Sequence, residues 1–407
     1  MNVYDTQDPK ILLKLKRLEA DALLDVIRTI NHAELSISQL CLIASNVLRA
    51  QLGVKKMYFH YFYLGEWHDE MRLGFRKLNQ FHLEDIYSLK QTTEVDREKH
   101  PYLTQLGVEY VIPILLRGEA IAYFLIADFA DSEVEAQNDL IFIETLGNIL
   151  AVAIQNRQLF QEKMDQEFLK RELEVAEAIQ HQLLISDFDR FSDIDVYAMN
   201  LAHHRVGGDF YDVIKKENGL TFVCIADVAG KGIPAALLMS NLQANLRALC
   251  AQYNDLISII KELNRLLYRI TVGEKFVTLF LGRIDPEEGK LRYINAGHNY
   301  PVFQRNQTQS FLDTGCVLLG IMPEVEPVET EMAVQTDDLL FAFTDGVVEQ
   351  PNQAGELFGN DRLYKLLETH HYASAQELVK LIRLSLESYA GGVQASDDIT
   401  MLGVRFT

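Results

Sequence analysis

Helical periodicity dominates the start of the chain. Residues 12–27 carry apolar side chains at roughly helical spacing, and Asp8 followed by Pro9 is typical of a helix start just before them. A second helical stretch covers about residues 36–52. The pattern predicts two helices ahead of the first strand.

Strand-like segments follow these helices. Residues 56–63 are rich in aromatic side chains, and residues 108–129 contain two apolar runs on either side of the turn Arg117-Gly118-Glu119. Over residues 15–160, the order of helices, strands, a late hairpin and a closing helix resembles a GAF-type sensory domain. The resemblance implies that a small molecule or a protein is the input signal, and residues 30–150 contain no ligand-specific motif.

One long helix is predicted in the middle of the chain. Residues 134–185 contain no proline and only one glycine, so a helix of about 50 residues would extend about 75 Å. The second half of this helix shows the alternating spacings of four and three that a coiled-coil seam requires. The seam positions are Leu169, Leu173, Ala176, Gln180 and Leu183, with Phe160 and Met164 upstream. The pattern favours a homodimeric coiled coil, and packing of the same stripe on the chain's own domains is the alternative.

Short β-rich segments separated by helical stretches follow residue 186. A chain of 407 residues is too long for a single ordinary core, which favours two domains. We therefore predict a sensory domain at residues 1–155, a helical coiled-coil linker at 156–185 and a second domain at 186–407. The expected fold class is α+β.

Composition and charge exclude several classes of protein. A formal net charge of −20 argues against a nucleic-acid partner, because phosphate contacts need clustered Lys and Arg. The longest apolar runs fall short of the roughly 20 residues that a membrane helix needs, and the N-terminus lacks a signal-peptide pattern. We therefore expect a cytoplasmic protein without a membrane span. The four cysteines form no paired motif, which argues against disulfides and zinc.

Four segments of the second half place aspartates after an apolar run or in a glycine-flanked turn. They contain Asp209, Asp227, Asp345 and the pair Asp397-Asp398. Mg²⁺ and Mn²⁺ favour carboxylate, carbonyl and water oxygens, and two such ions a few Å apart can clamp a phosphate. An aspartate beside glycine is usually structural when it stands alone, so the interpretation depends on all four segments together.

Five motifs in this half resemble, in their order, those of the bacterial PPM phosphatases of the SpoIIE and RsbU group. They are GGDFYD at residues 207–212, ADVAGKG at 226–232, NAGHN at 295–299, TDGV at 344–347 and DDIT at 397–400. The resemblance extends from about residue 176 to the C-terminus. It implies an α/β/β/α sandwich of two sheets flanked by helices, with a two-metal centre at one end.

The same resemblance implies roles for single residues. Asp227 would bridge two divalent cations, Mn²⁺ or Mg²⁺, and the main-chain carbonyl of Val228 would be the next ligand. Asp345 and Asp397 would give carboxylates to one cation, and Asp209 would contact the other directly or through water. Asp227 and Asp345 are the expected catalytic residues.

The implied reaction is hydrolysis of phosphoserine or phosphothreonine in a protein, without a phosphoenzyme intermediate. Relatives commonly act on a small STAS-domain anti-sigma-factor antagonist in a partner-switching circuit. A phosphorylated STAS-domain protein is therefore the expected substrate, with the sensory domain controlling the reaction. His298, in the NAGHN motif, is a possible general acid, although this motif is mainly a signature of the fold in the family.

Two other functions are weighed against the phosphatase. A nucleotide cyclase is suggested by Gly207-Gly208-Asp209-Phe210, but its fourth residue departs from the Gly-Gly-Asp-Glu-Phe signature and the later aspartates stay unexplained. A catalytically inactive signalling scaffold is the second alternative. The four intact acidic segments argue against it, because inactive relatives of an enzyme normally have other residues in place of the metal ligands.

Overall fold

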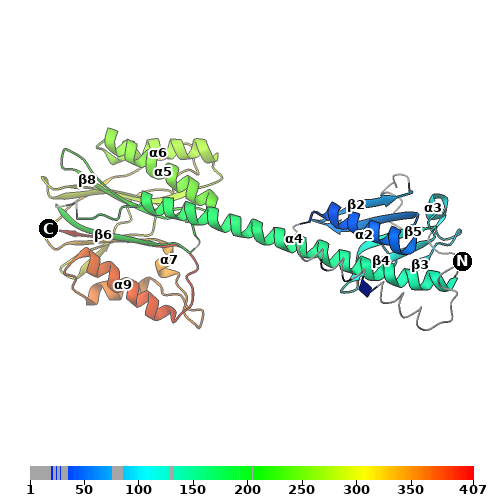
Figure 1. Ribbon diagram of the computed structural model, residues 1–407. Coiled ribbons are helices and arrows are strands. Elements are labelled where there is room, and N and C mark those ends of the chain that lie inside the picture. The colour runs from blue at the N-terminus through cyan, green and yellow to red at the C-terminus, as the bar shows by residue number, and fades with distance from the viewer. Residues whose placement is uncertain are drawn as a thin grey trace. The chain divides into compact units, whose positions relative to one another are not determined.

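The computed structural model describes residues 35–75, 86–128, 133–189, 191, 193–203 and 205–407, together with positions 20, 21, 24 and 28 (Figure 1). The chain divides into two compact units, residues 1–168 and 169–407. Most of the helix predicted at residues 12–27 lies outside the described residues. Each unit has its own sheet structure and hydrophobic core, as separate domains do.

An antiparallel five-stranded sheet forms the first unit, with strand order β2-β1-β5-β4-β3. Helix α2 (Ile37–Leu52) precedes it, beginning with a capping box at Ser36 and ending at Gly53, whose φ is 64°. The predicted hairpin about Gly118 is confirmed as β4 and β5. The remaining bounds are β1 (Lys56–Tyr63), β2 (Glu66–Leu73), β3 (Thr93–Glu94), α3 (Pro101–Leu106), β4 (Tyr110–Leu116) and β5 (Glu119–Ala127).

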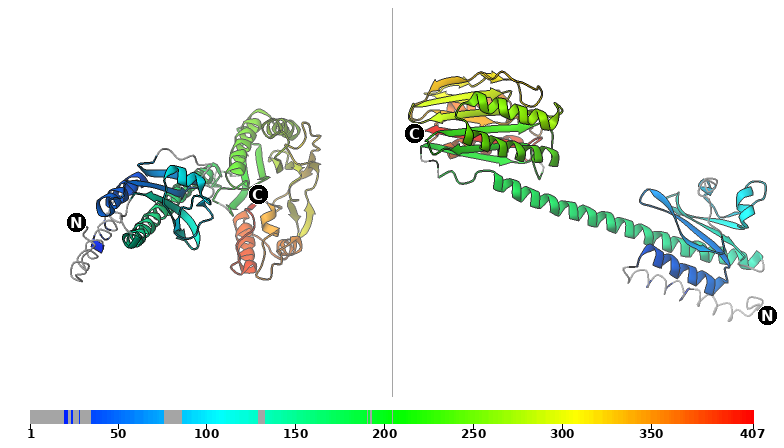
Figure 2. Two further views of the ribbon diagram at one scale, coloured as in Figure 1. Left: turned by 90° about the vertical axis from the view of Figure 1, so that its right-hand side faces the viewer. Right: turned by 90° about the horizontal axis from the view of Figure 1, so that it is seen from above.

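Alternation along β1 divides its side chains between two cores. Met57, Phe59 and Tyr61 pack with α2 and with helix α4 (Glu133–Leu183), which cover the same face of the sheet (Figure 2). Tyr58 belongs to the core on the opposite face. Tyr58, Phe59 and Tyr61 are therefore core residues, whereas Phe62 is exposed.

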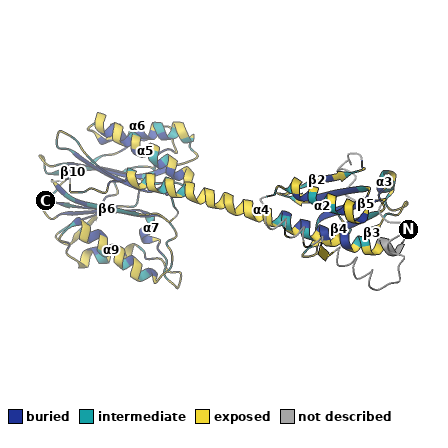
Figure 3. Ribbon diagram, viewed as in Figure 1, coloured by how far each residue is buried: buried dark blue, intermediate teal, exposed yellow. Residues whose placement is uncertain are grey.

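Helix α4 is continuous over 51 residues, close to the predicted 134–185. Its middle, residues 159–172, is exposed (Figure 3). Four of the predicted seam positions are half-buried within the second unit: Leu173, Ala176, Gln180 and Leu183. The exposed apolar positions of the helix include Phe160, Met164, Phe168, Leu169, Val175 and Ile179. Within the described part of the chain, no helix has the length and apolar character needed to cross a membrane.

Two stacked sheets form the second unit. The β8 sheet has strand order β13-β10-β9-β8-β7, with β14 paired to β10, and the β16 sheet has the order β12-β11-β15-β16-β6. The strand bounds are β6 (Ile194–Leu201), β7 (Phe210–Lys215), β8 (Thr221–Val228), β9 (Val277–Asp285), β10 (Lys290–Ala296), β11 (Val302–Arg305), β12 (Thr308–Phe311), β13 (Gly315–Cys316), β14 (Thr330–Ala333), β15 (Leu339–Phe343) and β16 (Ile399–Phe406).

Helices cover the outer face of each sheet (Figure 1). Helices α5 (Ile233–Gln252) and α6 (Leu256–Thr271) pack on the β8 sheet, and α7 (Asp345–Val348), α8 (Asn360–Thr369) and α9 (Ala375–Ala390) pack on the β16 sheet. Phe222 and Phe280 of one sheet share a core with Leu402 of the other. The unit therefore has four layers, helix, sheet, sheet and helix.

Candidate metal centre

The β8 sheet brings Asp209 and Asp227 together at one end. Asp209 immediately precedes β7 and Asp227 is the penultimate residue of β8. Because the two strands are antiparallel and Phe210 pairs with Ala226, residues 209 and 227 continue the same register. The two carboxyl groups interact, since the charge of Asp227 is, after burial, the largest cause of the raised pKa of Asp209.

The β16 sheet supplies the other candidate ligands. Asp345 begins α7 just after β15, and Asp397 and Asp398 stand just before β16. Strands β15 and β16 are antiparallel, with Phe343 opposite Met401, so the end of one lies beside the start of the other. The four acidic segments found in the sequence therefore come together from two sheets.

Thr400 connects the two sheets at this point. Its hydroxyl donates to Asp209 Oδ2 over 2.8 Å and accepts a hydrogen bond from Asn200 Nδ2 over 2.8 Å. Thr400 is fully buried and Asp209 is nearly so. The hydroxyl thus fixes one oxygen of the Asp209 carboxyl and leaves the other oxygen for another partner.

Asp398 explains why glycines flank the other aspartates. Its two oxygens accept hydrogen bonds from the main-chain N–H groups of His203 (2.7 Å) and Gly208 (3.1 Å). A Cβ at Gly207 would lie 2.0 Å from Asp398 Oδ2, and a Cβ at Gly346 would lie 2.0 Å from the Asp398 carbonyl oxygen. Only glycine allows these loops to close around Asp398. Asp398 therefore positions the loops that carry the other carboxylates.

Burial and mutual repulsion raise the pKa values of this cluster. Burial and then the charge of Asp345 raise the pKa of Asp227 to about 6. Burial and then the charge of Asp227 raise the pKa of Asp209, and burial and then the charge of Asp397 raise that of Asp345. The carboxylates therefore form one group of mutually repelling charges.

The ammonium of Lys231 reaches this group. Its Nζ lies 2.9 Å from Asp397 Oδ2 and donates to the Ser396 carbonyl oxygen over 3.0 Å. Lys231 belongs to the loop that joins β8 to α5 and so follows Val228 closely. The carbonyl oxygen of Val228 faces the Gly208 turn, where a Cβ would lie 2.7 Å from it.

The donor set fits a divalent cation, although the side chains do not form a complete coordination site. Within the described residues, no three acidic, histidine or cysteine side chains converge closely enough to hold a metal ion. Asp397 faces Lys231, and Asp209 is held by Thr400. Oxygen donors with uncompensated charge are nevertheless what Mg²⁺ or Mn²⁺ binds, and a cation would reverse the repulsion that raises these pKa values.

His298 has a structural position. Its side chain is buried, burial lowers its pKa to about 4, and its Nδ1 lies 2.9 Å from Thr278 Oγ1. Asn295 holds the turn, because its Oδ1 accepts from the His298 N–H (2.7 Å) and its Nδ2 donates to the His298 carbonyl (3.1 Å). A neutral, buried imidazole is a poor proton donor, so the NAGHN motif maintains the fold.

Sequence reasoning missed two residues that shape the site. Thr400 and Lys231 both stand inside motifs that were recognised, DDIT and ADVAGKG, but their contacts join distant parts of the chain. The available signal was the position of a hydroxyl and an ammonium beside the candidate ligands.

Known proteins resemble this chain mainly in its second unit. The family described as Stage II sporulation protein E (SpoIIE) matches residues 217–407. Phosphoserine phosphatase RsbU of Bacillus subtilis is 30% identical over 242 residues, which cover 59% of this chain and 71% of RsbU. Phosphoserine phosphatase RsbP of the same bacterium is 26% identical over 234 residues and is matched over 56% of its length, so this chain spans about half of it.

A solved structure supports the predicted architecture. The SiaA-PP2C domain of Pseudomonas aeruginosa superposes with a TM-score of 0.53 at 21% identity, covering 60% of this chain and 99% of that domain. This similarity shows the fold, and it confirms the expected PP2C-like layers of the second unit. The RsbU match, with the SpoIIE family match, establishes that the chain belongs to the SpoIIE and RsbU group of PPM phosphatases and is a protein serine/threonine phosphatase.

Proposed function

We propose that the chain hydrolyses phosphoserine or phosphothreonine on a regulatory protein with the help of two divalent cations, Mn²⁺ or Mg²⁺. Asp209, Asp227, Asp345, Asp397 and the Val228 carbonyl would hold them. Bound cations would neutralise the phosphoryl oxygens and acidify a water molecule. Asp227 and Asp345 are the proposed catalytic residues, because each lies in the electrostatic group that must hold the reacting phosphate.

The observation that carries this proposal is the mutual repulsion of the carboxylates. Asp227 and Asp345 come from different sheets, yet the charge of Asp345 adds to the effect of burial in raising the pKa of Asp227. A scaffold without catalytic activity would have no use for such a cluster, since uncompensated buried carboxylates lower stability. A bound cation would offset this loss of stability, and the cluster would then serve as its binding site.

The proposed substrate is a phosphorylated STAS-domain protein in a partner-switching circuit. Support comes from the relatives named Phosphoserine phosphatase RsbU and RsbP, which act on phosphoserine by name. The family resemblance, rather than a contact in the molecule, selects the STAS domain.

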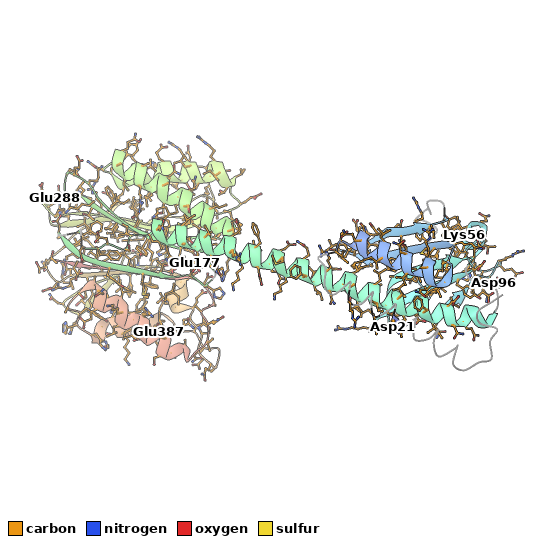
Figure 4. All side chains as sticks on the ribbon, viewed as in Figure 1. Asp21, Lys56, Asp96, Glu177, Glu288 and Glu387 are labelled. Carbon is orange, nitrogen blue, oxygen red and sulfur yellow. The ribbon has the colours of Figure 1, made fainter. Side chains whose placement is uncertain are left out.

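The linker is the proposed route from the sensory unit to the metal loops. Gln180 on α4 makes two hydrogen bonds with Gly207, from its Nε2 to the carbonyl (2.8 Å) and from the Gly207 N–H to its Oε1 (3.1 Å). Arg205 contacts Glu174 (3.1 Å) and Glu177 (3.7 Å), and Figure 4 labels Glu177 on the same part of α4. A movement of α4 would therefore act on the loop that positions Asp209.

The first unit is proposed to be a GAF-like sensory domain, at residues 1–155, followed by a linker at 156–185 and the phosphatase domain at 186–407. Homodimerisation through the linker and the sensory domain is proposed as well. Exposed apolar residues on α4, among them Phe160, Met164 and Phe168, support it, because single helices rarely keep such a stripe in water.

Hydrolysis of p-nitrophenyl phosphate by the full chain tests the proposed function. Turnover is expected with Mn²⁺ or Mg²⁺, none with chelator, and none in a folded Asp345→Asn variant with Mn²⁺. Absence of turnover together with absence of Mn²⁺ binding in the intact chain would favour the inactive scaffold instead.

A further inference from the structure

The loop between β8 and α5 places a lysine beside the carboxylate cluster. Lys231 contacts Asp397, one of the proposed cation ligands, through Nζ and Oδ2 at 2.9 Å. The Lys231 side chain is 48% exposed, so its ammonium reaches solvent as well as Asp397. The contact therefore joins a solvent-accessible positive charge to the proposed reaction centre.

We propose that Lys231 binds the phosphate group of the substrate, after a cation has taken its place at Asp397. This inference rests on the proposed function, because it assumes a phosphoester substrate and a cation at Asp397. The Lys231 ammonium pairs with the Asp397 carboxylate in the metal-free protein and would bind a phosphate oxygen in the loaded protein.

Competition for Asp397 is the first step of the argument. A divalent cation and an ammonium both need the negative charge of the same carboxylate, and the divalent ion attracts it more strongly. A half-exposed lysine–carboxylate pair contributes little stability, so its replacement costs little. The long, flexible stem of lysine then allows the ammonium to turn toward a new anion.

Charge balance is the second step. A phosphoester dianion must approach Asp209, Asp227, Asp345, Asp397 and Asp398, which all carry or share negative charge. An ammonium beside this cluster offsets part of that repulsion, and lysine is a common point-charge ligand of phosphate. The charges of Asp397, Asp398 and Asp345 all act on Lys231, so the ammonium lies within reach of the aspartates that the β16 sheet supplies.

Lys275 provides a matched control. It is exposed, and its Nζ would lie 3.0 Å from a Cβ at Gly230, so it lies beside the same loop as Lys231. Removing either lysine changes the net charge of the chain by the same amount. A general effect of charge on phosphate binding would therefore affect both variants equally.

The test is calorimetric binding of inorganic phosphate to the full chain loaded with Mn²⁺. In Lys231→Gln, the dissociation constant for phosphate is expected to rise about 10- to 100-fold, the size of one charge-assisted hydrogen bond. Lys231→Arg and Lys275→Gln should stay within about threefold of the unchanged protein. Mn²⁺ affinity of Lys231→Gln, measured separately, should be equal or tighter, because its competitor for Asp397 is gone.

Four results would overturn the inference. Equal phosphate affinity in Lys231→Gln, or no phosphate binding by the loaded unchanged protein, would show that Lys231 is not a phosphate ligand. Loss of Mn²⁺ affinity in proportion to loss of phosphate affinity would show that Lys231 only positions Asp397. An effect of Lys275→Gln as large as that of Lys231→Gln would show a general charge effect. Failure of the proposed function appears separately, as absence of Mn²⁺-dependent ester hydrolysis.

Discussion

Two buried acidic regions of the second unit differ in whether a cation of the chain neutralises their charge. Asp212, in the middle of β7, is completely buried, and Arg247 of α5 binds it with two hydrogen bonds, from Nε (2.5 Å) and from a terminal nitrogen (3.2 Å). Asp209, three residues earlier, has a threonine and another aspartate for neighbours instead of an arginine. One region is neutralised within the chain, and the other is left negative.

The difference separates a structural carboxylate from a functional one. Arg247 also donates to the carbonyl oxygen of Leu183 (3.2 Å), so the Asp212 pair ties the end of α4 to α5 and β7. Among the residues that the structure describes, none forms a comparable ion pair with Asp227, whose pKa is raised to about 6 by burial and then by Asp345. A buried charge that the fold does not neutralise is where an external cation is expected.

The largest expected effect comes from removing charge on the uncompensated side. In Asp227→Asn, Mn²⁺-dependent ester turnover should fall by about 10³-fold or more, the size typical of losing an electrostatic group at a reaction centre. Thermal melting should show that the metal-free variant is at least as stable as the unchanged chain, because one repelling charge is gone. A variant that keeps more than a tenth of the turnover would contradict the comparison.

Removing the arginine from the neutralised side should affect stability instead. Arg247→Met leaves the buried Asp212 carboxylate without its cation, which costs about 3–5 kcal/mol. Denaturant unfolding followed by hydrogen exchange in α5 and β7 measures this cost. The double variant Arg247→Met/Asp212→Asn should recover much of it, since the unpaired charge is absent. No loss of stability in the single variant would show that water already compensates Asp212.

Sequence reasoning located the acidic segments but could not distinguish these two regions. The aspartates of the metal centre stand in local motifs, and local features such as the strands at β1, β8 and β15 were predictable from apolar runs. The pairing of Asp212 with Arg247, or of Asp397 with Lys231, depends on which strands and helices meet in three dimensions. One sequence carries no record of that pairing.

The linker shows a second limit of periodicity. Gln180 and Leu183 fit a coiled-coil seam, yet both are half-buried within the second unit, where Gln180 bonds Gly207 and Gln243 Nε2 donates to the Leu183 carbonyl (3.0 Å). A heptad pattern predicts that a stripe of the helix is buried, but it does not predict which surface buries it. Dimerisation thus stays a prediction that the exposed apolar residues of α4 support.

The stability of the metal-free second unit should fall as pH rises. Between 3.8, the ordinary pKa of an aspartate, and about 6, the folded chain keeps the Asp227 proton that the unfolded chain has lost. The stabilising effect of that proton is complete below about pH 4 and is lost above about pH 6, a change of up to about 3 kcal/mol. Hydrogen exchange in β7 and β8 between pH 4.5 and 7 measures this change, once the exchange rates are corrected for the intrinsic exchange rate at each pH. Saturating Mg²⁺ should abolish the trend near neutral pH, and Asp227→Asn should flatten it without metal.

The smallest expected effect tests how finely Thr400 controls the uncompensated side. Its hydroxyl donates to Asp209 Oδ2, and this hydrogen bond lowers the pKa of Asp209 against the larger effect of burial. Thr400→Val keeps the shape of the side chain but removes the donor, so Mn²⁺ affinity should fall about 10-fold, at the lower end of what partners of metal ligands contribute. Thr278→Val, which removes the hydroxyl beside His298, is the matched control and should leave Mn²⁺ affinity within about threefold. Equal losses in both variants would mean that packing, and not the hydrogen bond to Asp209, sets the affinity of the site.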